Sequence, residues 1–332
     1  MTTRGTALFA TLIGSLVAGA LAAVGPAPAP AQAAEKVTYL LPAPPFLPAF
    51  APWMLAQARG YYTREGLEVE FQTARGGVDV AKQVGAGNAV IGGGIGDTPI
   101  IVRANVIPVK AVAVLGGRSL TQLVARADSD IQGPADLKGK TVTTMSYQDT
   151  TFYALLGALA SAGLGKDDLD IQAAGPAGVW KLFAAGKSVA MAAVPDWIGI
   201  VRAQGIQVRV MPIETYFKSM AQAILASDET IAKRPELIAK LVRATLHGMK
   251  DIMADPDGAA VDYVKAVAQH KGKEKGMAAV FRLYNTYVYP GQKVVGAMDP
   301  ERLAAVQDFY VLQGIVRRPA PLDDLYTNQF VE

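Results

Sequence analysis

Side chains suited to hold a small molecule directly follow a strand predicted at residues 89–91. The glycine run 92–96 ends in Asp97 and Thr98, and a helix is predicted at 98–105. Glycine lets the backbone approach a ligand closely, and either side chain could contact that ligand. The alternative is that Asp97 or Thr98 only caps the helix. The run does not have the G-x-G-x-x-G spacing of a dinucleotide site, so we interpret it as a glycine-lined ligand loop.

A second polar loop opens a helix predicted at 150–162. It carries hydroxyl, phenol and amide groups, on Ser146, Tyr147, Gln148, Thr150 and Thr151. The free backbone N–H groups at a helix start can bind a carboxylate, sulfonate or phosphate oxygen. We therefore predict this loop as the best polar part of a binding site.

Two aromatic segments could supply flat apolar surface. Prolines within 44–52 would hold Phe46 and Trp53 as a wall, although Trp53 could instead pack the first helix onto the sheet. Trp197 follows Asp196 after a strand predicted at 190–194, and could stack on a planar ligand or lie at a rim without ligand contact.

Charge near these loops favours an organic ligand. Arg118 could neutralise an anion, or form an ion pair, or remain solvated. The candidate loops otherwise carry Asp97, Asp149 and Asp196. Nitrate or bicarbonate is therefore less expected than a ligand with a planar or apolar part.

Composition argues against several chemistries. The chain has no cysteine, which excludes disulfides, thiolate nucleophiles and iron–sulfur ligation. Its two histidines, His247 and His270, fall in a late helical region where we expect structural or solvated roles. No G-x-x-x-x-G-K-[ST] pattern occurs, so ATP hydrolysis would belong to another subunit. We predict no catalytic residue, no metal and no cofactor.

The elements that position these loops alternate between short apolar runs and helical patterns, which is typical of an α/β protein. The alternation runs through residue 115 and starts again at 141. Apolar runs at 120–125 and 221–226 could carry the chain between two lobes. We predict lobe one from 34–124 plus 222–332 and lobe two from 125–221, joined by a two-stranded hinge, with a helical C-terminal region packed on lobe one. Two sequential domains are the alternative, but no Ser/Gly-rich linker lies between 125 and 140.

The N-terminus predicts export. Arg4 precedes an apolar stretch at 7–24, and Ala31-Gln32-Ala33 offers a cleavage point, so residues 1–33 are predicted to be a cleaved signal peptide. A membrane anchor is the alternative, but glycines and prolines interrupt the stretch. We expect the exported chain to be soluble and periplasmic. Its charge, 32 basic against 29 acidic residues, is too balanced to indicate nucleic-acid binding.

Several strings resemble one family, in order along the chain. Residues 60–69, GYYTREGLEV, resemble a signature of periplasmic binding proteins of the nitrate, sulfonate, taurine and thiamine-pyrimidine-precursor type. Residues 133–140, GPADLKGK, resemble that family's entry to its second lobe, and Gly76-Gly77 also matches, which adds Gly77 to the candidate site.

The resemblance implies a type II periplasmic binding fold. It also implies a monomer that captures a sulfonate, aromatic acid or heterocycle between its lobes and contacts an ABC permease with its ATPase. Two alternatives stay open: an enzyme like the thiamine-pyrimidine synthases on the same fold, or a sensor that docks on a membrane receptor.

Overall fold

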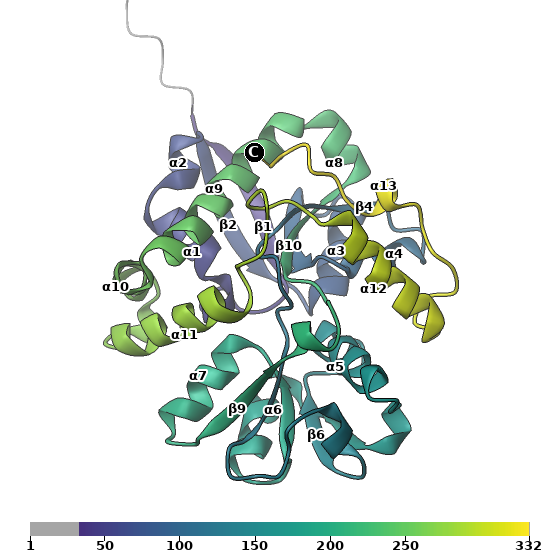
Figure 1. The fold of residues 1–332 in the computed structure, drawn as a ribbon. Coiled ribbons are helices and arrows are strands. Elements are labelled where there is room, and N and C mark those ends of the chain that lie inside the picture. Colours follow the sequence, from purple (N-terminus) through teal and green to yellow (C-terminus); the bar gives the residue numbers. More distant parts are fainter. Residues whose placement is uncertain (1–32, 332) are drawn as a thin grey trace, which may run out of the picture. The chain divides into compact units, whose positions relative to one another are not determined.

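The computed structural model describes residues 33–331, so the predicted signal peptide lies outside the described residues except for Ala33. Residues 34–332 form one compact unit. This unit contains two five-stranded sheets, which we call the sheets of lobe one and lobe two. As predicted, both are α/β layers with helices against their faces (Figure 1).

The sheet of lobe one is mostly parallel. Its strands lie in the order β2 (Leu67–Thr73), β1 (Glu35–Leu41), β3 (Ile91–Ile95), β10 (Gln222–Ser227) and β4 (Val109–Val114). Strand β1 pairs in parallel with β2 and β3, whereas β10 runs antiparallel to both of its neighbours. All six residues of β10 are buried. A strand that follows lobe two in sequence therefore lies inside the sheet of lobe one.

The sheet of lobe two repeats this order. Its strands are β7 (Asp170–Ala173), β6 (Thr141–Thr144), β8 (Ala190–Ala193), β5 (Gln122–Arg126) and β9 (Val208–Pro212). The lobe boundary predicted after residue 124 falls inside β5, which pairs with β8 and β9, so the first crossing ends before Gln122. Strand β9 was not predicted, because it is a half-exposed edge strand without a continuous apolar run.

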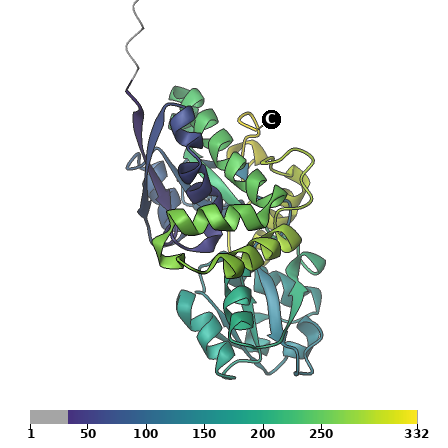
Figure 2. The same cartoon turned by 90° about the vertical axis from the view of Figure 1, so that its left-hand side faces the viewer.

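Helices of lobe one come from both ends of the described chain. The early ones are α1 (Ala51–Ala58), α2 (Tyr61–Arg64), α3 (Gly77–Gly85) and α4 (Thr98–Arg103). The late ones are α8 (Asp228–Lys233), α9 (Pro235–Ala254), α10 (Pro256–Ala266), α11 (Glu274–Tyr287), α12 (Pro300–Leu312) and α13 (Leu322–Leu325). Figure 2 shows the late helices, in green and yellow, beside the strands and helices of lobe one, which confirms the predicted helical C-terminal region.

Helix α9 packs directly on α1 because a glycine faces the contact. A Cβ at Gly248 would lie 2.0 Å from the carbonyl oxygen of Pro52, so no larger side chain fits there. Lobe two has three α-helices, α5 (Thr150–Ser161), α6 (Gly175–Ala184) and α7 (Pro195–Ala203). None of the helices in the described part of the chain is both long and apolar enough to cross a membrane.

The two crossings between the lobes lie side by side. Leu120 N donates to the carbonyl of Met220 at 3.1 Å, and the hydroxyls of Ser119 and Ser219 contact each other. Arg302 of α12 is 8% exposed and donates to both the Ser219 carbonyl and the Glu214 carboxylate, which also accepts from Ser119 N. We call the set of Arg302, Glu214, Ser119 and Ser219 the hinge brace. It ties both crossings to a C-terminal helix.

Candidate functional site

Loops at the carboxyl ends of strands in both sheets carry the predicted site residues. Asp97 follows β3 in lobe one, the loop 145–149 follows β6 in lobe two, and Asp196 follows β8 in lobe two. The carboxyl ends of parallel strands are where α/β proteins bind ligands. Contacts of these residues define two junctions between the lobes.

The first, which we call the Asp97 junction, comprises Asp97, Tyr310, Tyr153 and Asp149. Asp97 is 1% exposed, and its Oδ2 accepts a hydrogen bond of 2.5 Å from the Tyr310 hydroxyl of α12. The ring of Tyr310 lies 5.4 Å from the ring of Tyr153, which belongs to α5 of lobe two. Lobe two therefore contacts the side chain that bonds Asp97.

The carboxyl groups of this junction lie close enough to affect the pKa of each other's neighbours. Burial raises the pKa of Asp97 to about 7, which the hydrogen bond from Tyr310 opposes and the nearby Asp149 carboxylate augments. Burial also raises the pKa of Tyr153, and Asp97 and Asp149 raise it further. The junction is acidic, and its carboxyl groups bind protons more tightly than ordinary aspartates.

The loop that opens α5 is held by its own side chains. Asp149 Oδ1 accepts from the backbone N and the hydroxyl of Thr151, at 2.9 and 2.6 Å. Tyr147 is 54% exposed and donates to the Ile171 carbonyl. Gln148 is exposed, and its backbone N donates to the half-buried Ser146.

The sequence predicts that free N–H groups in this loop bind an anion. In the structure, Asp149 already caps the helix and takes one of these donors. Thr150 is half-buried at the first position of α5, and Thr151 is 4% exposed.

The second, the Asp196 junction, comprises Asp196, Ala49 and Tyr284. Asp196 lies in the first turn of α7 in lobe two and is 6% exposed. Its Oδ2 accepts from Ala49 N at 3.0 Å, and its Oδ1 accepts from the Tyr284 hydroxyl of α11 at 2.9 Å. Both donors belong to lobe one. Burial raises the pKa of Asp196 to about 6, against the effect of these hydrogen bonds.

The aromatic candidates separate into three environments. Trp53 is 0% exposed and packs edge-on against Tyr39 and Phe50 in the core of lobe one. It thus packs the first helix onto the sheet, which was the alternative to a ligand-binding role. Trp197 is 9% exposed and packs with a core cluster of lobe two that also includes Leu283 of α11. Phe46 is 37% exposed, and its carbonyl accepts from Tyr263 and contacts His270.

Most of the glycine run lies in a strand and not in a loop. Residues 92–94 lie inside β3, where a Cβ on Gly92 would meet Val80 at 2.2 Å and one on Gly94 would meet Leu225 at 2.5 Å. Gly77 starts α3 and lies against Gly94 and Thr98. The Thr98 hydroxyl accepts from Ile95 N. The interpretation of residues 92–94 as a loop is wrong, because these glycines allow close packing between β3, β10 and α3.

Arg118 forms no ion pair with the junction carboxylates among the described residues. It is exposed, its Nη1 donates to the Thr286 carbonyl at 3.0 Å, and its backbone N donates to Val288. No ion pair within residues 33–331 includes Asp97, Asp149 or Asp196. The described junctions thus have buried acids without a basic partner.

The histidines lie in lobe one. The ring of His247 lies 5.2 Å from that of Tyr61, and His270 stacks on Tyr263. Among the residues that the structure describes, no group of three or more His, Cys, Asp or Glu side chains could hold a metal ion.

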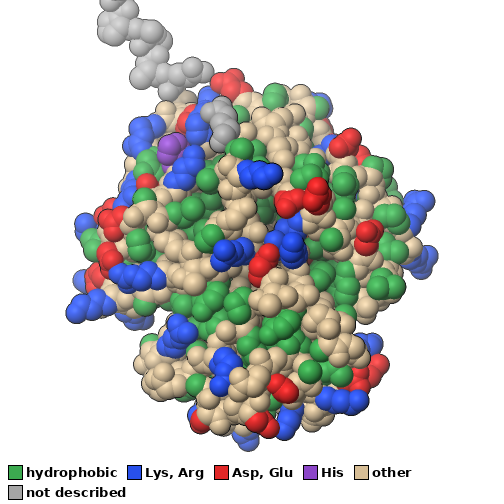
Figure 3. Space-filling view, in the orientation of Figure 1, with side chains coloured by type: hydrophobic (Ala, Val, Ile, Leu, Met, Phe, Trp, Pro, Cys, Tyr) green, Lys and Arg blue, Asp and Glu red, His purple; other side chains and the backbone are tan. Residues whose placement is uncertain are grey.

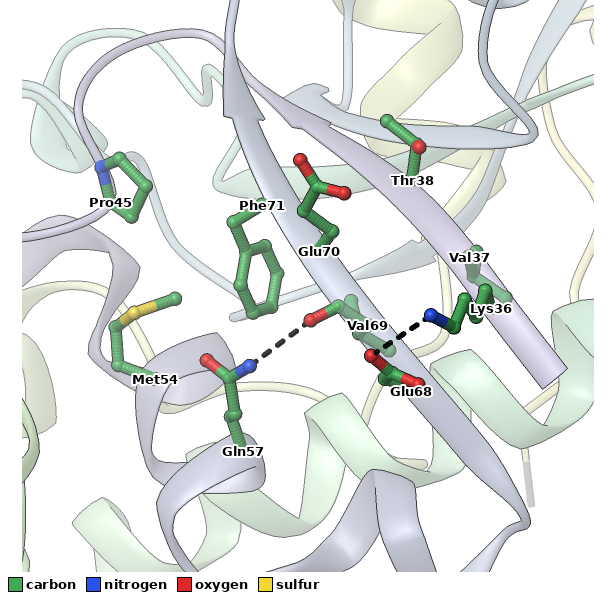
Figure 4. A pocket seen from close by; sticks show the side chains of 10 residues that line it. All are labelled: Lys36, Val37, Thr38, Pro45, Met54, Gln57, Glu68, Val69, Glu70 and Phe71. Atoms are coloured by element: carbon green, nitrogen blue, oxygen red, sulfur yellow. Dashed lines mark hydrogen bonds and ion pairs between the residues drawn. The ribbon is translucent and has the colours of Figure 1, made fainter. Parts of the chain in front are cut away.

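A pocket of about 510 Å³ lies away from both junctions, at the β2 edge of lobe one. Figure 4 shows that its lining includes Glu70 and Phe71 of β2, beside an ion pair of Lys36 with Glu68 and a hydrogen bond from Gln57 to the Val69 carbonyl. None of the predicted site residues lines it. On the face shown in Figure 3, hydrophobic side chains gather in a belt between the two lobes.

Residues missed by sequence reasoning come mainly from the C-terminal helices. Tyr284, Tyr310 and Arg302 each bond a group at a junction or a crossing, and all three follow the second crossing. The only signal in the sequence is the concentration of tyrosines at 284, 287, 289 and 310 in a helical region. Spacing alone does not show which of these tyrosines reach the junctions between the lobes.

A protein-family model described as "NMT1/THI5 like" matches residues 47–259. Riboflavin-binding protein RibY of Chloroflexus aurantiacus is 28% identical over 323 residues, covering 92% of this chain and 89% of that protein. 4-Amino-5-hydroxymethyl-2-methylpyrimidine phosphate synthase of Aspergillus parasiticus is 23% identical over 233 residues, covering 65% of this chain and 67% of that protein.

Among solved structures, the chain is similar to the periplasmic aliphatic sulphonate binding protein SsuA of Escherichia coli. The TM-score is 0.71 at 18% identity, covering 87% of this chain and 96% of that one. This similarity confirms the predicted type II periplasmic binding fold, with two α/β lobes and two crossings between them.

Proposed function

This chain belongs to the NMT1/THI5-like family, and on that premise we propose that it is the periplasmic solute-binding component of an ABC importer. In this proposal residues 1–33 direct export and are removed. The lobes close on a small organic solute, and the closed form contacts the permease, whose ATPase drives import. The protein itself performs no catalysis.

One observation carries the proposal: side chains at the carboxyl ends of strands in both sheets meet where the lobes contact each other. Tyr310, which bonds Asp97 of lobe one, packs against Tyr153 of lobe two. Asp196 of lobe two bonds Ala49 and Tyr284 of lobe one. Ligands of proteins with two α/β lobes bind at such interfaces.

In this proposal, the contacts that cross between the lobes determine how the lobes close. A ligand can shift the open and closed populations only by the difference in its affinity for them. The two hydrogen bonds of Asp196 join lobe two to lobe one, so they stabilise the closed form and are lost when the lobes part. The hinge brace keeps the crossings together while the lobes move.

Riboflavin is the first solute to test, because a riboflavin-binding protein is similar to 92% of this chain. The synthase similarity supports a pyrimidine as the second, and the SsuA fold supports an alkanesulfonate as a third.

The experiment uses residues 34–332, titrated with each solute by calorimetry, with small-angle scattering before and after ligand addition. The expected result is one solute class that binds and reduces the radius of gyration. Chemical turnover of the bound solute, or no binding by any class, would overturn the proposal.

A further inference from the structure

A buried carboxylate oxygen at the Asp97 junction has no partner. Asp97 Oδ2 accepts from Tyr310, but Oδ1 is buried and accepts from no group among the described residues. Buried polar atoms in native proteins are almost always hydrogen-bonded, since an unpaired one loses its hydration without compensation. A donor from outside the chain would complete this site.

The groups around that oxygen determine which donor fits. The Asp149 carboxylate of lobe two lies near enough to raise the pKa of Asp97. Tyr153 of lobe two packs on the ring of Tyr310, whose hydroxyl bonds Asp97. The one arginine among the buried residues described, Arg302, already bonds Glu214 and Ser219. An anionic ligand would therefore meet carboxylates without a cation to offset them.

The N-terminus of α5 does not offer an alternative anion site at this junction. Asp149 caps it and accepts from Thr151 N, which places a carboxylate where a ligand oxygen would otherwise bind. Each lobe thus contributes a carboxylate to this junction.

We propose that Asp97 recognises the ligand through Oδ1, and that the ligand class is a planar compound with an N–H donor or a cationic nitrogen, not a sulfonate or carboxylate. This inference rests on the proposed solute-binding function. The Tyr310 hydroxyl bonds Asp97, and the rings of Tyr310 and Tyr153, 5.4 Å apart, would provide aromatic surface for a planar ligand. Because Oδ1 is buried and Tyr153 of lobe two packs against Tyr310 of lobe one, a ligand reaches Oδ1 only when the lobes part.

The test measures binding by residues 34–332 with four probes at equal concentration. Riboflavin and 4-amino-5-hydroxymethyl-2-methylpyrimidine carry N–H donors, whereas ethanesulfonate and benzoate carry only anionic acceptors. Calorimetry should detect binding of an N–H donor and of neither anion. If riboflavin binds, N3-methylriboflavin, which lacks the imide N–H, should bind at least about tenfold more weakly than riboflavin.

The variant Asp97→Asn keeps an acceptor for Tyr310 but turns an amide toward the ligand. It should lose at least about tenfold in affinity for the N–H donor, with an unchanged circular dichroism spectrum. Asp130→Asn is the matched control, because Asp130 is exposed on lobe two and the change in charge is the same. Its affinity should equal that of the unmodified chain.

Three outcomes would overturn the inference. If an N–H donor binds and both Asp97→Asn and the N-methylated analogue bind equally well, Asp97 does not recognise it, although the solute-binding function stands. If only ethanesulfonate or benzoate binds, the ligand class is wrong and the function again stands. If none of the four probes binds, the proposed function fails and this inference fails with it.

Discussion

The two junctions each contain a buried aspartate bonded by a tyrosine of a C-terminal helix, yet they differ in where the bond leads. The Asp97–Tyr310 bond joins two parts of lobe one, whereas the Asp196–Tyr284 bond joins lobe two to lobe one. Asp196 has both oxygens bonded, and Asp97 has one that finds no partner within residues 33–331. The same pair of residue types therefore joins the two lobes at one junction and leaves a buried acceptor unpaired among the described residues at the other.

The two junctions should differ most in how their stability depends on pH, and the change is greatest at Asp97. Its folded-state pKa of about 7 lies above the ordinary value of 3.8, so the folded chain binds the proton more tightly than the unfolded chain. The stability due to the neutral carboxyl is present below pH 3.8 and is lost as the pH rises to about 7. Asp97→Asn should stabilise the unliganded protein by up to about 4 kcal/mol at pH 8 and by almost nothing near pH 4.

Urea unfolding of the variant and the unmodified chain at both pH values measures this difference. The same comparison at Asp196, whose pKa is about 6, should level off at a lower pH. A stability difference that is independent of pH at Asp97 would show that its carboxylate is solvated in the folded protein.

A smaller effect is expected when the cross-lobe contact is removed. Asp196→Ala deletes acceptors for Ala49 N and Tyr284, and should destabilise the closed form by about 2 kcal/mol, since hydrogen bonds to charged groups contribute about 1.5 to 3 kcal/mol each and water replaces part of them. Small-angle scattering should give a larger radius of gyration than for the unmodified chain. Asp97→Ala serves as the control, and an equal expansion in both would mean that the junctions do not differ.

Tyr284 and Tyr310 allow the two junctions to be compared by removing one hydroxyl from each. Tyr284→Phe and Tyr310→Phe each delete one hydroxyl that donates to a carboxylate, at a cost of about 1.5 kcal/mol. The first should shift the lobes toward the open form and weaken ligand binding, because its bond crosses between them. The second should lower the melting temperature without opening the lobes. Scattering and thermal unfolding of the two variants together distinguish these results.

The smallest effect is expected at Arg118. Among the described residues, this exposed side chain bonds the Thr286 carbonyl and neither aspartate. Arg118→Ala should change stability and ligand affinity by less than about 0.5 kcal/mol. A tenfold loss of affinity by calorimetry would restore the hypothesis that this arginine neutralises an anion.

The alternation of strands and helices was predictable from the sequence, because apolar runs and glycine or proline stops are local signals. Asp97 and Asp196 were found among the candidates by their place after predicted strands. Their partners were not, since Tyr310 and Tyr284 are far from them in the chain and reach them only through packing of α11 and α12. The glycine run shows the reverse case: its composition suggested a loop, but contacts with Val80 and Leu225 explain it by strand packing.

The position of β10 has a consequence for how the chain is made. The sheet of lobe two is complete once residue 212 has emerged, since all its strands are contiguous in sequence. The sheet of lobe one is not, because β3 and β4 are joined only through β10, which comes after lobe two. During synthesis from the N-terminus, the edges of β3 and β4 stay without their partner until residue 227 is available. Lobe two can therefore acquire its structure before lobe one does.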